Sequence, residues 1–142
     1  MTEPVKTAYI PELGKKYTIP HFNKQYRESL KYFRDEGQLE TEIENQLGKD
    51  LMKFFDAQIN LDKLNMGYLQ DTLKISDKEL EKFDGQVKPE DFRYAAYRTA
   101  MLVQGRSEKE AEEAVNGLKS LSEQSEENDG SGEKESDQSS KK

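Results

Sequence analysis

The chain has 142 residues and a net charge of −7, with 36% charged and 32% hydrophobic side chains. So small an apolar share excludes a large buried core, and the acidic balance argues against a phosphate-binding surface over most of the molecule. The absence of Cys and the single His exclude disulfides, thiolate metal sites, a Cys nucleophile and multi-His metal sites.

Targeting segments are the next feature that the sequence can exclude. No run of apolar residues approaches the roughly 18 that suggest a transmembrane helix. The chain begins MTEPVK, which lacks the apolar stretch of a signal peptide. The lack of Cys also fits a reducing compartment. We therefore expect a protein of the cytoplasm that does not enter a membrane.

The N-terminal segment, residues 1–21, differs in composition from the rest of the chain. It holds three of the four prolines, namely Pro4, Pro11 and Pro20. Because proline fixes φ and donates no backbone hydrogen bond, a helix is disfavoured here. Two short β-prone runs, residues 9–10 and 17–19, could pair as a hairpin, although two strands alone are marginally stable. We favour an extended arm that docks on another surface and keep the hairpin as the alternative.

Residues 22–122 are predicted to be helical. In the first helix, apolar residues recur at spacings of four, four and three, at Phe22, Tyr26, Leu30 and Phe33, and Gly37 is its predicted end. In the next helix they recur every four residues, at Ile43, Leu47, Leu51, Phe55 and Ile59. A capping-box pattern at residues 41–44 would begin this helix, and Gly48 could break it at residues 48–50.

The second half of this region carries clearer boundary signals. Residues 62–73 fit either a short helix or a turn-rich connection. A capping box at residues 76–79 begins a short helix that ends near Phe83. Pro89 marks the first turn of a strong helix, which Gly105 ends. A third capping box, at residues 107–110, begins the last helix.

Residues 123–142 contain no Val, Ile, Leu, Phe, Met, Tyr or Ala and carry a net charge of −4, from three Lys against seven Asp and Glu. Such a segment buries too little surface to offset its ordering entropy, so we predict a disordered acidic tail. The predicted fold is all-α: about five helices in residues 22–122, preceded by an extended or hairpin arm and followed by this tail.

No group of residues stands out as a catalytic site. His21 is the one side chain with an ordinary pKa near neutrality, and its place at a helix entry favours a structural or surface role. Residues 62–67 have faint calcium-loop spacing, but the twelfth position is Leu73 where a Glu is needed. No phosphate-binding loop or dinucleotide motif occurs. The sequence therefore predicts a protein that is not an enzyme and uses no cofactor or metal.

One helix face is basic, at Lys24, Arg27, Lys31 and Arg34. The spacing of three and four places these side chains on one side of the first helix, as a nucleic-acid interface requires. This supports an alternative function, that of a small nucleic-acid-associated regulator or adaptor. We favour a solvated face paired with nearby carboxylates.

Aromatic residues are numerous in a chain with so few aliphatic ones, with 7 Tyr and 6 Phe. They either complete a thin core or form a surface that meets another protein, and self-association is one way to stabilise such a domain. The residues that we predict to contact a protein partner are Phe54, Phe55, Tyr94, Tyr97 and Met101.

Three stretches carry a resemblance to a known family: LEKFDG at residues 80–85, KPEDF at 88–92 and MLVQG at 101–105. With the short charged helix and acidic tail that follow, residues 76–142 resemble tail assembly chaperones of long-tailed phages and prophages of Gram-positive bacteria. The resemblance implies a helical, non-enzymatic protein of the host cytoplasm. It also implies two partners, the tape measure protein, which such chaperones coat, and the tail tube subunits, which they recruit. The Pro-containing arm has no counterpart in that pattern.

Overall fold

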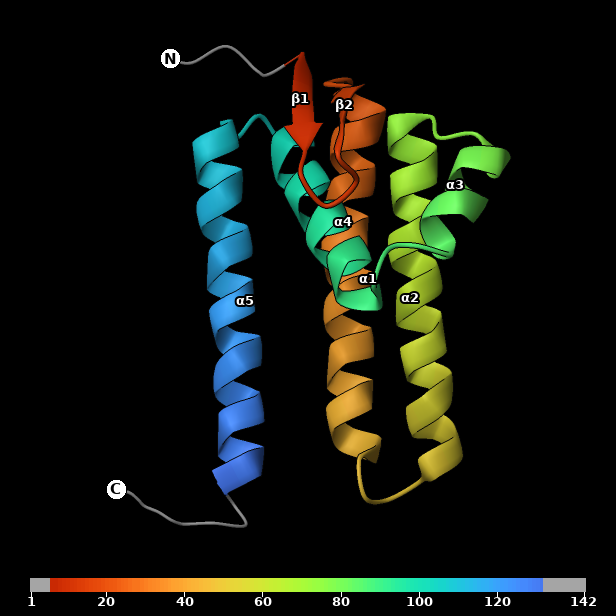
Figure 1. The fold of residues 1–142 in the computed structure, drawn as a ribbon, viewed down its shortest axis with the longest axis vertical. Coiled ribbons are helices and arrows are strands. Elements are labelled where there is room, and N and C mark those ends of the chain that lie inside the picture. Colours follow the sequence, from red (N-terminus) through yellow and green to blue (C-terminus); the bar gives the residue numbers. More distant parts are fainter. Residues whose placement is uncertain (1–5, 132–142) are drawn as a thin grey trace.

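Five helices follow a two-stranded β-hairpin in the part of the chain that the computed structural model describes, residues 6–131, with side chains described to residue 121 (Figure 1). The elements in chain order are β1 Thr7–Ile10, β2 Lys15–Thr18, α1 Asn23–Gln46, α2 Leu51–Leu73, α3 Asp77–Asp84, α4 Pro89–Val103 and α5 Glu108–Ser131. The predicted all-α architecture is confirmed. The preference for an extended N-terminal arm was wrong, because this segment forms the hairpin that was the alternative.

The β-hairpin is antiparallel, with Thr7 opposite Thr18 and Ile10 opposite Lys15. Its turn uses Gly14 in the left-handed region, at φ 68°, which glycine adopts without a steric penalty. Alternate residues point inward, so Ala8 and Ile10 are buried. Strand β1 contacts α4, and this packing stabilises two strands that would be marginal alone.

Helices α1 and α2 form a long antiparallel pair, which corrects two predicted boundaries and settles one open alternative. Helix α1 continues through Gly37, and the capping-box pattern at residues 41–44 lies inside it. A mid-helix glycine costs about 1 kcal/mol, which the packing of α1 on α2 outweighs. The ambiguous residues 62–73 form the last turns of α2.

The helix break that the sequence allows at residues 48–50 is confirmed, because α1 ends at Gln46 and α2 begins at Leu51. Gly48 has φ 79°, and Asp50 caps α2 by accepting a hydrogen bond from the Lys53 backbone N–H at 3.2 Å. Deeper in the pair, the Tyr32 hydroxyl donates to Asn65 Oδ1 at 2.6 Å, and the Tyr32 and Tyr68 rings stack at 4.6 Å. A buried polar contact of this kind fixes the register of the two helices.

The boundary signals of the later helices are confirmed. Ser76 Oγ accepts from the Glu79 N–H at 3.1 Å at the start of α3, and Pro89 is the first residue of α4. Ser107 and Glu110 form a reciprocal capping box, with hydrogen bonds of 3.0 and 3.1 Å. Gly105 ends α4 with φ 93°.

The last helix is longer than the sequence predicts. Helix α5 runs to Ser131 and so includes residues 123–131, which we had placed in the disordered tail. Glu and Gln have high helix propensity and extend a helix that a capping box has started. The rest of the predicted tail, residues 132–142, lies outside the described residues.

Helix α4 is the centre of the core and packs on α1, α2, α5 and the β-hairpin (Figure 1). Small residues let its neighbours approach closely: Ala95, Ala96 and Ala100 have no exposed surface. Phe92 and Leu102 of the same helix are also buried in the core. The core is therefore compact, and it lies at the end of the molecule that carries the β-hairpin.

A buried arginine joins three elements. The Arg98 guanidinium, on α4, contacts both carboxylate oxygens of Glu12 at 3.1 and 2.9 Å, and its third nitrogen donates to Glu112 Oε1 at 2.6 Å. The Arg98 and Glu12 side chains are 6% and 5% exposed. This pairing ties the turn of the β-hairpin to α4 and to α5.

We expect Arg98→Met to lower the free energy of unfolding by about 3–5 kcal/mol, because it leaves the buried Glu12 carboxylate without a partner. Urea unfolding measures this loss. The matched control is Arg34→Met, which removes an exposed pair with Asp35 and is expected to cost under about 1 kcal/mol. Equal losses for the two variants would contradict the assigned role of Arg98.

The third member of this network predicts a pH dependence. Hydrogen bonding to Arg98 lowers the pKa of Glu112 from its ordinary value of about 4.5. The ionised carboxylate therefore stabilises the fold above that value, and its contribution is lost as the pH falls through the lowered pKa. We expect the difference in melting temperature between wild type and Glu112→Gln to be present at about pH 7 and to shrink at about pH 3. A difference that stays constant with pH would refute this.

Candidate protein-binding surface

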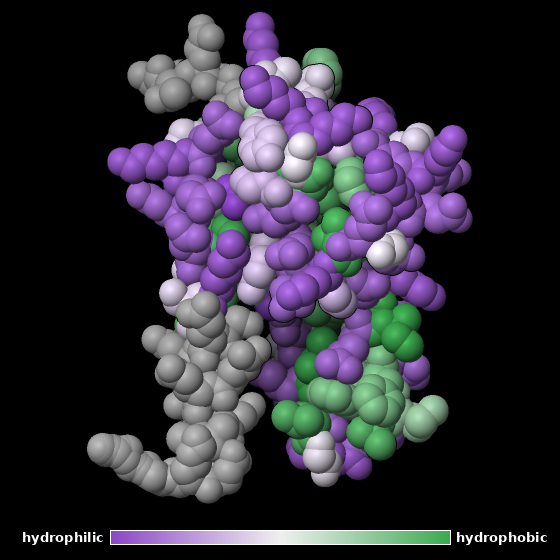
Figure 2. Space-filling model, in the orientation of Figure 1, coloured by the Kyte–Doolittle hydropathy of each residue, from purple (hydrophilic) through white to green (hydrophobic). Residues whose placement is uncertain are grey.

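The connection between α1 and α2 carries a cluster of exposed apolar side chains. We call it the tip patch: Leu47, Leu51, Met52, Phe55 and Ile59. Their exposed fractions are 62%, 62%, 70%, 46% and 52%. Figure 2 shows hydrophobic surface gathered at this lower end of the molecule, whereas the rest of the visible face is mainly hydrophilic. Contiguous exposed apolar surface of this kind marks an interaction site.

The patch has two causes: helical periodicity places its residues on one face, and α4 does not extend far enough to cover them. At 100° per residue, the four α2 members lie within an arc of about 100° on one face of the helix. Helix α4 covers the other end of the α1–α2 pair, beside the β-hairpin (Figure 1). Since it stops short of the α1–α2 connection, it leaves that face uncovered. The apolar residues of segment 43–59 thus extend past the end of the core, and the part nearest the connection stays exposed.

The structure divides the predicted partner-binding residues into two groups. Phe54 and Phe55 lie at the tip, with ring centroids 5.7 Å apart; Phe54 is half-buried beside the patch. Tyr94, Tyr97 and Met101 lie on α4 and are packed between helices.

The contacts of the α4 group are specific. Tyr94 is 9% exposed and its ring lies under the Lys119 ammonium at 5.2 Å, while the Tyr97 ring meets Phe33 edge-on at 4.9 Å. Met101 packs against the core. These contacts place the three side chains inside the folded chain.

Sequence reasoning missed Met52, although the signal was present. Met52 stands seven residues before Ile59, so both occupy the same face of α2. The every-four pattern through Leu47 and Leu51 predicts a helix, but it does not include Met52. Periodicity shows which residues share a face of a helix, but it does not show which part of that face a neighbouring helix covers.

A groove of about 570 Å³ lies beside the tip patch, between α1, α2 and the start of α4. Its apolar walls include Ile43, Leu61 and Tyr94. Its charged walls are Glu40 on α1, Asp62 on α2, and Glu90 and Arg93 on α4. This volume is in the range of ligand pockets, but the groove is open along its length.

Carboxylates outnumber cations in this groove. Arg93 pairs with Glu36 at 2.8 Å and with Glu40. Burial raises the pKa of Glu40, and the Glu36 charge adds to this rise against the opposing effect of Arg93. Burial also raises the pKa of Asp62, with a further contribution from Asp84. Within residues 6–121, neither the half-buried Asp62 nor the exposed Glu90 forms an ion pair, so both carboxylates are open to a cation from outside the chain.

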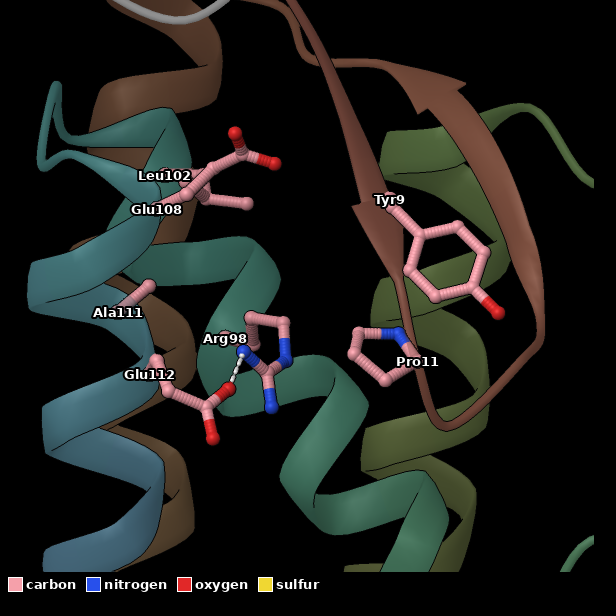
Figure 3. Close-up of a pocket in the computed structure, with 7 residues that line it drawn as sticks. All are labelled: Tyr9, Pro11, Arg98, Leu102, Glu108, Ala111 and Glu112. Atoms are coloured by element: carbon pink, nitrogen blue, oxygen red, sulfur yellow. Dashed lines mark hydrogen bonds and ion pairs between the residues drawn. The ribbon is translucent and has the colours of Figure 1, made fainter.

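A second hollow, of about 180 Å³, lies where Arg98 meets Glu112 (Figure 3). Tyr9 and Pro11 of the β-hairpin face it from the other side. It is smaller than the roughly 300–1,000 Å³ of ligand pockets, and its central charges already bind one another. We assign it a structural role.

The remaining predicted residues do not converge on a site. His21 is half-buried in the segment before α1. Among the described residues, no group of three or more His, Asp or Glu is placed to hold a metal ion.

The predicted basic face of α1 is exposed at all four of its residues, Lys24, Arg27, Lys31 and Arg34. Acidic side chains interrupt it, because Asp35 pairs with Arg34 at 2.9 Å and Lys31 shares a hollow with Glu28 and Asp71. The result is a face of mixed charge, as the solvated interpretation expects, rather than a basic stripe.

Comparison with protein-family models, curated proteins and solved structures found no match to this chain. In the part of the chain that the structure describes, none of the helices combines the length and apolar content that crossing a membrane requires.

We expect the tip patch to drive the predicted self-association. The double substitution Met52→Glu/Ile59→Glu should abolish any rise of molar mass with concentration in light scattering, while stability changes by about 0.5 kcal/mol or less. The control is Phe22→Ser, because Phe22 is 75% exposed but lies at the opposite end of α1. A wild-type monomer at every concentration, or an equal effect of Phe22→Ser, would contradict this expectation.

Proposed function

We propose that this protein is a non-enzymatic assembly chaperone of phage tails, which coats the tape measure protein and recruits tail tube subunits. The observation that carries the proposal is the tip patch, an uncovered apolar face on a highly charged molecule. The sequence resemblance at residues 76–142 supplies the identity of the partners. The chaperone acts by shielding: its apolar face covers apolar stretches of a long helical client, and its charged surface keeps the complex in solution.

The size of the patch indicates how tightly such a client is held. Burying a large apolar side chain completely contributes about 1.5–3 kcal/mol, and the patch residues are already about half covered. Five of them contribute on the order of 1 kcal/mol each, or about 5 kcal/mol together. Association costs about 4–15 kcal/mol, so the patch alone gives weak, reversible binding. Weak binding suits a chaperone that must leave its client, and stronger capture needs further contacts.

The test is co-expression with the tape measure protein encoded in the same genome. We expect the wild-type chain to keep that protein soluble and to co-purify with it. The Met52→Glu/Phe55→Glu variant should capture at least about tenfold less tape measure protein, because binding would bury two carboxylates against the apolar surface of the client.

Phe22→Ser is again the control, since it removes an exposed aromatic residue away from the patch. Circular dichroism confirms that each variant is folded. A tape measure protein that is equally soluble without this chain, or that is captured equally by the tip variant, would overturn the proposed function.

A further inference from the structure

The tip patch and the groove form one continuous surface along α2. Leu51, Phe55, Gln58 and Asp62 stand at spacings of four, three and four, which places them within an arc of about 60°. On α1, Ile43 of the groove is one turn before Leu47 of the patch. From Leu51 to Leu61 the surface extends about 15 Å, or nearly three helical turns. A single helix can therefore cover both parts.

The charges along this surface are one-sided. The patch end is apolar, whereas the groove end carries Glu40, Asp62 and Glu90 against one arginine, Arg93, which is already paired with Glu36 and Glu40. Asp62 and Glu90 are the groups available to a cation from outside the chain. An occupant that brings lysine or arginine to this end satisfies them and lowers the raised pKa of Asp62.

We propose that this surface binds an amphipathic helix of a protein partner, with an apolar stripe against the tip patch and lysine or arginine side chains against Asp62 and Glu90. The inference rests on the proposed function and names the kind of client segment recognised. Charge complementarity selects this occupant over two others. A second copy of the chain has a net charge of −7 and the chain's own residues 123–142 carry −4, so charge disfavours both as occupants of the groove, whereas self-association needs only the apolar tip patch.

The first experiment uses two synthetic helical peptides and the full-length protein. Both peptides have leucines at positions i, i+4 and i+7; one flanks them with lysines and the other with glutamates. Fluorescence anisotropy should show the lysine peptide binding at least about tenfold more tightly, with the difference shrinking at high salt. Asp62→Lys/Glu90→Lys should abolish or invert this preference.

The matched control is Asp71→Lys/Glu113→Lys, which changes the net charge by the same amount at exposed positions outside the groove. It should keep the preference to within about twofold. Equal binding of the two peptides to wild type, or an equal loss in this control, overturns the proposal, because general charge attraction then explains the result. If Asp62→Lys/Glu90→Lys does not fold, Asp62→Asn/Glu90→Gln is used and should weaken the lysine peptide about threefold or more.

A photo-crosslinking amino acid identifies the segment in the complex with the tape measure protein. Placed at Gln58 it should capture an amphipathic segment with flanking basic residues; placed at Asp71, on the opposite side of α2, it should capture none. Capture of an acidic or wholly apolar segment overturns the inference, yet leaves the proposed function standing if the tip variants still lose the client. If the protein distinguishes the two peptides but does not bind the tape measure protein, the proposed function is refuted and the inference about the groove stands.

Discussion

The buried guanidinium of Arg98 is the interaction on which the arrangement of the β-hairpin, α4 and α5 depends. It faces Glu12 and Glu112, which come from elements far apart in the sequence. Desolvating such a pair offsets most of its Coulomb energy, so its main effect is on specificity. Any arrangement that separates the hairpin turn from α4 leaves a charge buried without a partner. A small core in which α4 presents alanines to its neighbours gains a geometric constraint from this pairing.

That constraint also explains where the uncovered surface lies. The β-hairpin and α5 gather around α4, so the core forms at one end of the α1–α2 pair (Figure 1). With 32% hydrophobic residues, the chain has too little apolar material to extend the core along 24-residue and 23-residue helices. The far end keeps its apolar face without a covering element. The proposed binding surface thus lies at the end of the molecule that is away from the core.

The sequence predicted best what depends on neighbouring residues. The caps at Ser76 and Ser107 and the start at Pro89 are local, and all three are confirmed. The helix end predicted at Gly37 was wrong, because α1 is stabilised by packing on α2, and local propensity does not include that packing. The Arg98–Glu12 contact spans 86 positions, and no spacing rule indicates it. The tip patch was visible as a pattern, but its exposure depends on how far along the α1–α2 pair α4 reaches.

The two parts of the proposed binding surface differ in what they contribute. The tip patch provides affinity without selectivity, because any apolar helix face gains by covering Leu51 and Phe55. The groove provides selectivity, because Asp62 and Glu90 favour a basic segment and disfavour an acidic one. Apolar burial resists salt while charge pairing is screened by it, so the two contributions are physically separable. Under the proposed function, such a surface would discriminate among helical segments of similar hydrophobicity and still release the one that it binds.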